Sequence, residues 1–269
     1  MIIDLHIHIR KSLPDSEWVW EQWPGQQQMG ITAEQCIEKM EACTPKIDMA
    51  LVFGLRSLAS ENMESMRSEN DYILKVVEAY PDRFIGAGVI DPSWGDKAIE
   101  ELKRFAEAGL RVVKIRFSSM HYHANNKAGQ KIFAEIEKLG MLPVCHSDWT
   151  HYSNPLVLGD LAGMFPELKM VMQHFGEYLS FDAISVCKEL DNIYVDTSAL
   201  VHSKNVVKFI EEVSPDRIMM ASDALSIRGG LQPQCALNRI LGLGLPKEQE
   251  EKVLGGNAIE LLKSVGVNL

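Results

Sequence analysis

Short apolar runs rich in β-branched residues recur along the chain, and longer amphipathic stretches separate them. Apolar runs of this length are typical of buried β-strands, such as those of a parallel sheet. The pattern occurs in eight segments, at residues 2–8, 49–54, 84–90, 112–117, 142–146, 169–174, 193–196 and 217–222. The chain therefore contains enough strands for one large parallel sheet.

The intervening stretches show helical periodicity. Ile99, Leu102 and Phe105 fall on one face of a helix, and Thr32 followed by Gln35 is a typical helix start. Strands that alternate with helices pair in parallel through right-handed crossovers. Eight such units predict an α/β fold of the (β/α)8 TIM-barrel type, as a single domain over residues 1–269. A doubly wound open sheet is the alternative, although it would usually use fewer strands.

One long segment has neither pattern. Residues 10–30 are irregular and contain Trp18, Trp20 and Trp23. A loop of this length after the first strand is long enough to fold over the barrel mouth. We therefore expect a lid-like loop at this position.

Composition narrows the class of protein. The 27 basic and 37 acidic side chains give a net charge of −10, which argues against a nucleic-acid partner. The five cysteines form no C-x-x-C pair, so neither a disulfide framework nor a zinc ribbon is expected. No apolar run approaches the length of a membrane span, and the N-terminus does not read as a signal peptide. We expect a cytoplasmic protein without a membrane partner.

Candidate catalytic and metal-binding residues occur where the predicted strands end, and TIM barrels carry their active sites at these strand ends. His6 and His8 are two residues apart in the first strand, so both imidazoles should face the barrel interior. A lone strand histidine is more often a satisfied polar residue. Two adjacent buried imidazoles need a shared partner, and a metal ion is the simplest one.

Three further polar residues end later strands. His146 ends the fifth strand and Asp223 follows the eighth, so both can join the two histidines as metal ligands. An isolated aspartate at such a position would more often cap a helix or form a turn. His174 ends the sixth strand; it could bind a second metal, donate a hydrogen bond to a substrate carbonyl, or be an ordinary interior histidine.

The ordered set of these segments resembles the amidohydrolase superfamily, in particular its amidohydrolase-related (amidohydrolase 2) branch of metal-dependent hydrolases and decarboxylases. The matching segments are DLHIH at 4–8, VKI at 113–115, LPVCH at 142–146, PELK at 166–169, QHFG at 173–176, IYVDTS at 193–198, DRI at 216–218, SD at 222–223 and GGNA at 255–258. The resemblance implies a distorted TIM barrel. It also implies one divalent ion, most commonly Zn²⁺, at His6, His8, His146 and Asp223, with His174 close by.

Two positions on the fourth strand bear on the metal count and the substrate. Lys114 lies where some relatives carry a carboxylated lysine that bridges two metals, and lysine also occurs there in mononuclear relatives. We favour one metal, with a binuclear site as the alternative. Arg116 stands where relatives often have a histidine, so the resemblance does not identify the substrate.

Arginines at strand ends suggest a substrate that carries a carboxylate. Arg10, Arg56, Arg116 and Arg228 all lie at or just beyond strand ends, although each alone could form a surface ion pair. Trp149 and Tyr152 could supply an apolar wall. We expect a small-molecule substrate and a homo-oligomer, most simply a dimer.

The main functional hypothesis is hydrolysis of a small carbonyl compound, such as a lactone or amide, by a metal-activated water. Asp223 would take the proton of that water, and His174 would stabilise the developing oxyanion. The alternative is a metal-dependent non-oxidative decarboxylase (a lyase) acting on a conjugated or aromatic acid. A third hypothesis is a barrel that holds its metal for structure alone.

Overall fold

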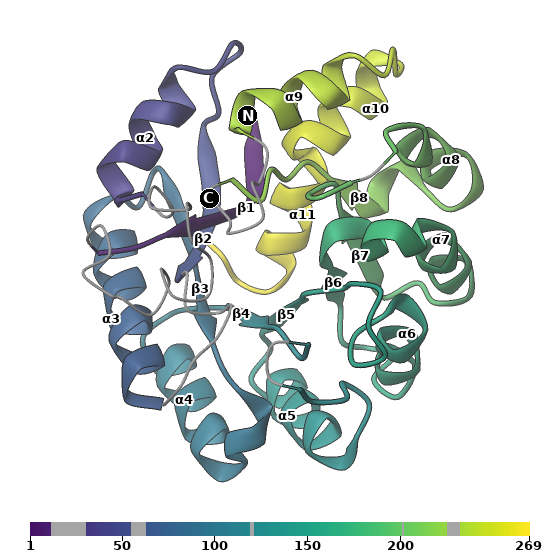
Figure 1. The fold of residues 1–269 in the computed structure, drawn as a ribbon. Coiled ribbons are helices and arrows are strands. Elements are labelled where there is room, and N and C mark those ends of the chain that lie inside the picture. Colours follow the sequence, from purple (N-terminus) through teal and green to yellow (C-terminus); the bar gives the residue numbers. More distant parts are fainter. Residues whose placement is uncertain (12–30, 55–62, 119–120, 201, 225–231) are drawn as a thin grey trace, which may run out of the picture.

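Eight parallel strands form one sheet whose spatial order follows the sequence (Figure 1). The computed structural model describes residues 1–11, 31–54, 63–118, 121–200, 202–224 and 232–269. The strands are β1 (Ile3–Ile9), β2 (Met49–Gly54), β3 (Phe84–Val89), β4 (Val112–Ile115), β5 (Leu142–Cys145), β6 (Met170–Met172), β7 (Ile193–Asp196) and β8 (Ile218–Met219). All eight predicted strands are therefore present, several of them shorter at their ends than the sequence pattern suggests.

The last strand returns to the first, so the sheet forms a nearly closed barrel. The amide of Leu5 in β1 donates a hydrogen bond to the carbonyl of Met220, just after β8, at 3.1 Å. A parallel bridge between Ile7 and Ala224 continues this seam. The predicted (β/α)8 architecture is confirmed, and the open-sheet alternative is wrong.

The helices surround the strands as an outer layer (Figure 1). They are α2 (Ala33–Glu41), α3 (Met63–Ala79), α4 (Asp96–Glu107), α5 (Lys127–Lys138), α6 (Pro155–Gly163), α7 (Ser180–Glu189), α8 (Lys204–Glu212), α9 (Pro233–Leu241), α10 (Lys247–Glu251) and α11 (Asn257–Ser264). In α4, Leu102 and Phe105 are buried on one face, as their spacing predicts. At α2, Thr32 and Gln35 form the reciprocal capping box.

The core has two layers. Side chains such as Leu5, Leu51 and Val144 fill the barrel interior, so the barrel is a packed core and not a pore. A second cluster, which includes Ile7 and Phe105, lies between the strands and the surrounding helices.

Two further expectations concern the segment after β1 and membrane-spanning helices. The predicted lid, over residues 10–30, lies mostly outside the described residues, because the description stops at residue 11 and resumes at residue 31. Among the helices of the described segments, none combines the length and the apolar character needed to cross a membrane.

Candidate metal centre and active site

Three potential metal ligands converge at the seam between the first and last strands. His6 Nε2 lies 3.1 Å from Asp223 Oδ1, and His8 Nε2 lies 3.4 Å from the same oxygen. The two imidazole nitrogens are 3.2 Å apart. All three residues are buried. The structure thus brings together three of the four residues expected to hold the metal.

A β-bulge in β1 aims both histidines at this point. Between Asp4 and Ile7 the register with β2 shifts, so that three steps along β1 match two steps along β2. Ile3 and Leu5 belong to the barrel interior, whereas Ile7 and Ile9 pack against the outer helices. The extra residue reverses the alternation, and His6 and His8 then face inward, where both rings contact Phe53.

Asp4 connects the bulge, through hydrogen bonds, to the segment that carries Asp223. One carboxylate oxygen of Asp4 accepts hydrogen bonds from the amides of His6 at 3.1 Å and Ser222 at 2.9 Å. Asp223 follows directly with a left-handed backbone, at φ 52°. Buried Asp4 therefore fixes the two ends of the seam relative to each other.

The chemistry of the three converging atoms fits a divalent cation. A neutral imidazole nitrogen and a carboxylate oxygen are all lone-pair donors, so their close approach needs a proton or a cation between them. Burial opposes charge on His6, but the carboxylates of Asp223 and Asp196 together outweigh it and raise the pKa of His6 above its ordinary value. Burial would raise the pKa of Asp223, yet the two histidines hold it well below the usual range.

His174 lies next to this group, in the segment after β6. Its backbone amide donates to Asp196 Oδ1 at 2.8 Å, and its ring Nδ1 is 2.9 Å from Ser198 Oγ. The rings of His6 and His174 are 4.9 Å apart between centroids. His6, His174 and Asp196 form a second cluster of potential ligands.

The backbone that presents His174 is left-handed over four consecutive residues. His174, Phe175, Gly176 and Glu177 have φ values of 62°, 49°, 72° and 50°. Non-glycine residues rarely adopt this conformation, and each costs on the order of 1–2 kcal/mol. Such strain is characteristic of functional sites, and here it turns the chain so that His174 faces the metal ligands.

His146 is close to this centre but is oriented differently. Its ring lies 4.5 Å from that of His174, and its Nε2 is 3.2 Å from Asp148 Oδ2. Asp148 is itself held by the amide and hydroxyl of Thr150. Burial first, then the nearby charge of Arg116, put the pKa of His146 well below its ordinary value, which leaves the imidazole neutral. A role for His146 as fourth ligand stays a prediction.

Lys114 is fully buried in β4 on the interior side. Its ammonium group contacts the side-chain oxygen of Gln173 and lies 4.9 Å from the centre of the Phe53 ring. Burial, followed by the charge of Arg116, lowers the pKa of Lys114 to about 7. Its role as a bridging ligand stays a prediction.

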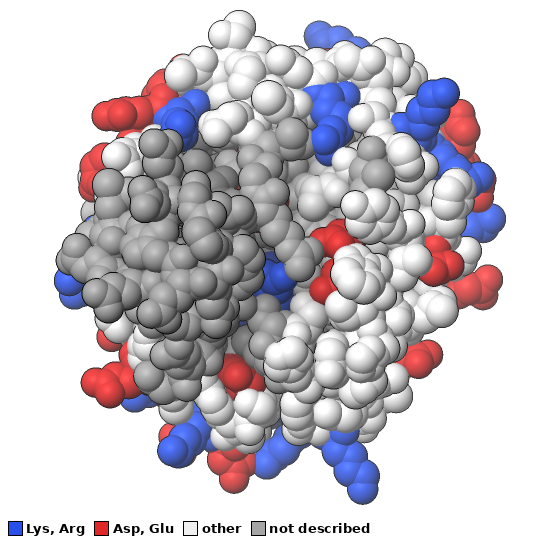
Figure 2. All heavy atoms as spheres, viewed as in Figure 1, with Lys and Arg blue, Asp and Glu red and all other residues white. Residues whose placement is uncertain are grey.

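Only some of the predicted substrate-binding residues lie in the described part of the chain. Arg10 and Arg116 follow β1 and β4 directly, and each is half-buried. Arg56 and Arg228 lie outside the described residues. Trp149 is 60% exposed, and Tyr152 packs against His151 with ring centroids 4.1 Å apart. On the face viewed down the barrel, basic side chains line part of a central hollow with acidic side chains beside it (Figure 2).

Asp148 and Ser198 were not among the residues expected at the site. Both follow a site residue by two positions, Asp148 after His146 and Ser198 after Asp196. A buried polar side chain just past a barrel strand was the available signal, but small polar residues are common in loops, so sequence alone did not single these two out.

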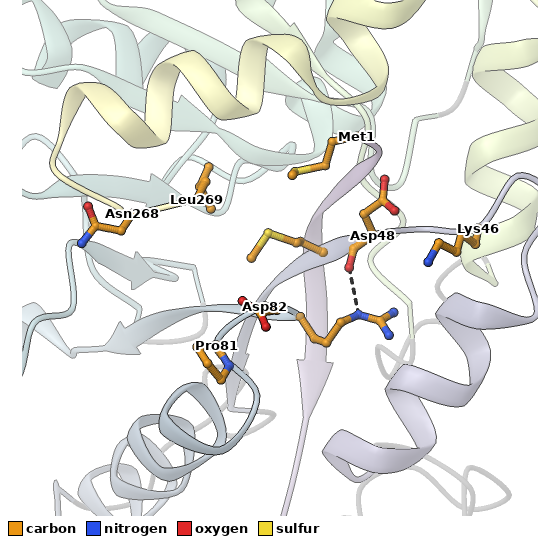
Figure 3. Close-up of a pocket in the computed structure, with 9 residues that line it drawn as sticks. Met1, Lys46, Asp48, Pro81, Asp82, Asn268 and Leu269 are labelled. Carbon is orange, nitrogen blue, oxygen red and sulfur yellow. Dashed lines mark hydrogen bonds between the residues drawn. The ribbon is translucent and has the colours of Figure 1, made fainter.

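A cavity of about 690 Å³ occurs elsewhere, where the strands begin (Figure 3). Its lining includes Met1, Lys46, Asp48 and Leu269. Arg83 also lines it, and its guanidinium already donates to the carbonyls of Asp48 and Ile47 and to Glu41. This end of a TIM barrel serves stability, so the cavity is separate from the candidate active site.

Comparison with known proteins identifies related enzymes. The chain is 25% identical over 256 residues to a 2-amino-3-carboxymuconate-6-semialdehyde decarboxylase of Dictyostelium discoideum, an alignment that covers 79% of this chain and 70% of that protein. A 2,6-dihydroxybenzoate decarboxylase from Rhizobium has a similar structure, with a TM-score of 0.76, 16% identity and coverage of 98% of this chain and 99% of that one.

A third similar protein was solved with a bound metal. The 5-carboxyvanillate decarboxylase of Novosphingobium aromaticivorans, with bound manganese and 3-methoxy-4-hydroxy-5-nitrobenzoic acid, gives a TM-score of 0.77 at 15% identity, with coverage of 98% of this chain and 97% of that one. All three of these similar proteins are decarboxylases. The main hypothesis of a hydrolase is therefore wrong, and the decarboxylase alternative is the better supported one. Strand-end histidines and an aspartate indicate a metal site but do not distinguish the two reactions.

A family model described as Amidohydrolase (Amidohydro_2) matches residues 3–263. This span includes every strand of the barrel and all of the converging ligands. The chain belongs to this amidohydrolase family.

Proposed function

We propose that the protein is a metal-dependent, non-oxidative decarboxylase of a small conjugated or aromatic carboxylic acid. The observation that carries the proposal is the similarity, along 79% of the chain, to a decarboxylase of a conjugated semialdehyde acid. The converging His6, His8 and Asp223 support it, because they provide a site for the divalent cation.

We further propose that His6, His8 and Asp223 hold one divalent cation, with His146 as the fourth ligand. When bound, the cation supplies a Lewis acid that polarises a substrate oxygen. Three imidazoles and a carboxylate suit Zn²⁺, whereas one structural relative binds manganese. Metal analysis of the purified protein distinguishes these two ions.

Besides the cation, the reaction requires positive charge that binds the acidic substrate and a group that carries a proton, and residues of the barrel can supply both. A proton is first added to the carbon that bears the carboxylate, which makes this carbon tetrahedral. The carbon–carbon bond to the carboxylate then breaks, its electron pair restores the conjugated system, and carbon dioxide leaves. Arg116 and Lys114 place positive charge beside His146, as their effect on its pKa shows, and we propose that they orient the acidic substrate. His174, which is buried next to His6, is the proposed carrier of the proton.

A panel of substrates tests the proposal. The metal-loaded protein is incubated with aromatic and conjugated enoic acids, and with lactones and amides as the contrasting set. We expect release of carbon dioxide with formation of the decarboxylated product, and release at least about 100-fold slower from the Asp223→Asn variant. Hydrolysis of a lactone or amide without any carbon dioxide release from the acids would overturn the proposal.

A further inference from the structure

The hydroxyl of Ser198 connects the two histidine clusters. Ser198 lies just past β7, is fully buried, and places its Oγ 2.9 Å from His174 Nδ1 and 3.3 Å from His6 Nδ1. The same oxygen hydrogen-bonds Asp196 Oδ1. One small side chain thus contacts all three members of the second ligand cluster.

Because a hydroxyl has only one proton, the direction of the three hydrogen bonds at Ser198 Oγ can be worked out. Serine has one proton to donate and two lone pairs to accept with. Asp196 Oδ1 also accepts from the amides of His174 at 2.8 Å and Ser198 at 3.0 Å, which marks it as an acceptor. The serine proton therefore goes to Asp196, and both imidazole contacts must be made by ring N–H groups that donate to Oγ.

We propose that Ser198, held by Asp196, is a positioning residue that keeps the ring proton of His174 on Nδ1, and that it does the same for His6 together with Asp196 Oδ2, which lies 3.5 Å from His6 Nδ1. Nε2 of His174 then carries the lone pair, and Nε2 of His6 is the atom left to bind the cation. In His6 this is the atom that lies 3.1 Å from Asp223 Oδ1, within the candidate metal centre. In His174 it is the atom left to take up or deliver a proton.

The same hydroxyl accounts for the second ligand cluster without an ion. Its one donor and two acceptor sites are all used by Asp196, His6 and His174. A cation bound among these three residues would have to displace both ring protons. This arrangement therefore agrees with the single cation already proposed at His6, His8 and Asp223.

The tautomers can be measured without a substrate, so the inference does not depend on the proposed decarboxylation. Long-range ¹H–¹⁵N spectra of the metal-free wild-type protein, at mildly alkaline pH, separate protonated from unprotonated ring nitrogens. His174→Gln and His6→Gln variants assign the signals. We expect a proton on Nδ1 of both rings; in the metal-free protein His6 also carries a second proton on Nε2, next to Asp223 Oδ1. A wild-type spectrum with the His174 proton on Nε2 overturns the proposal.

Substitution of Ser198 tests whether this residue is the cause. In Ser198→Ala, which removes one oxygen, we expect His174 to populate the Nε2–H tautomer and metal affinity to fall about 10–100-fold. Ser198→Thr keeps the hydroxyl and should restore both readouts. Ser185→Ala is the control, because the Ser185 hydroxyl lies on the exposed side of α7 and donates to the Phe181 carbonyl, away from the histidine rings and from the turn that carries His174. Unchanged tautomers and affinity in Ser198→Ala overturn the proposal, as does binding of two ions by the wild-type protein.

Discussion

At the scale of single residues, the centre is defined by an electrostatic conflict. His6 Nε2, His8 Nε2 and Asp223 Oδ1 lie within 3.4 Å of one another in a buried site. Without a cation, a proton on His6 relieves the conflict, which is why its pKa is raised. The carboxylate of Asp223 is thus the group on which both proton and metal binding depend.

Replacing Asp223 by asparagine should remove this dependence. The amide side chain has the same size as the carboxylate but no charge, so we expect metal affinity to fall at least about 10-fold and carbon dioxide release about 100-fold or more. The pKa of His6 in the metal-free protein should fall as well, because its counter-charge is gone. Isothermal titration with the metal and an activity assay measure these effects. Asp160→Asn, on the exposed side of α6, is the control, and unchanged metal affinity in Asp223→Asn would contradict the assignment.

The types and strand-end positions of the main site residues were visible in the sequence, but their orientations were not. Spacing alone placed His6 and His8 on one face, and the structure shows that a bulge in β1 decides which face this is. A bulge depends on pairing with β2, so it has no local signal. For the same reason, the contact of His146 with Asp148 could not be foreseen, since it depends on how the loop after β5 folds back.

At the scale of elements, the left-handed turn after β6 is a strained support for His174. Gly176 has φ 72°, and a Cβ at this position would lie 2.7 Å from Pro155 Cγ of α6. Gly176→Ala should therefore destabilise the protein by at least about 1–2 kcal/mol and weaken metal binding, because the turn must shift.

The chain provides a matched glycine for comparison. Gly163 ends α6, and a Cβ there meets only Leu190 Cδ2 at an ordinary 3.9 Å. Gly163→Ala should be neutral or stabilise by up to about 1 kcal/mol. Urea unfolding of both variants measures the difference, and equal stabilities would show that the turn does not resist a side chain.

A buried hydrogen-bond network also joins the helices α3 and α4 to the end of β3. Asn70 of α3 exchanges hydrogen bonds with the backbone of Val89, at 2.8 and 2.9 Å, and also contacts Glu101 of α4. Glu101, only 3% exposed, accepts from Arg67 at 3.0 Å and from Arg104 at 2.9 Å. Burial would raise the pKa of Glu101, but the bonds and charge of Arg104 outweigh it and lower the pKa.

The lowered pKa makes stability depend on pH in a defined direction. The unfolded carboxyl titrates near pH 4.5, so the stability that Glu101 contributes is complete above that pH. It is lost as the pH falls through the lower pKa of the folded state. Glu101→Gln should cost about 1–3 kcal/mol at neutral pH, and its difference from wild type should shrink in acid. Urea midpoints across this pH range test this, with exposed Glu100→Gln as control; a constant difference would contradict it.

The same elements show why the fold was more predictable than the site. Apolar runs such as those of β2 and β7 start and end where the sequence pattern predicts, because burial between helices and barrel interior requires continuous apolar residues. The β8 run was expected over residues 217–222 and is a strand only at Ile218–Met219. Beyond Met219 the chain pairs with β1 through single contacts at the seam, which periodicity does not encode.

At the scale of the whole molecule, the candidate metal centre lies across the weakest join of the barrel. The β1–β8 seam is held by few backbone bonds, such as Leu5 N to Met220 O at 3.1 Å and His8 N to Ala224 O at 3.5 Å. His6 and His8 come from one side of this seam, and Asp223 comes from the other. A cation bound by all three would therefore link the first strand to the last.

Metal removal should consequently loosen the seam as well as abolish activity. At a free metal concentration about 100 times the Kd, binding adds about 2.7 kcal/mol of stability, which for a chain of this size corresponds to a Tm higher by about 5–10 °C. Calorimetry with and without a chelator measures this difference. Hydrogen exchange at the Leu5 amide should accelerate in the chelated protein more than at Met170, whose amide bonds the Asn192 carbonyl on the far side of the barrel. In His8→Ala the metal should no longer shift the Tm. A Tm shift that persists in this variant would place the stabilising ion elsewhere in the molecule.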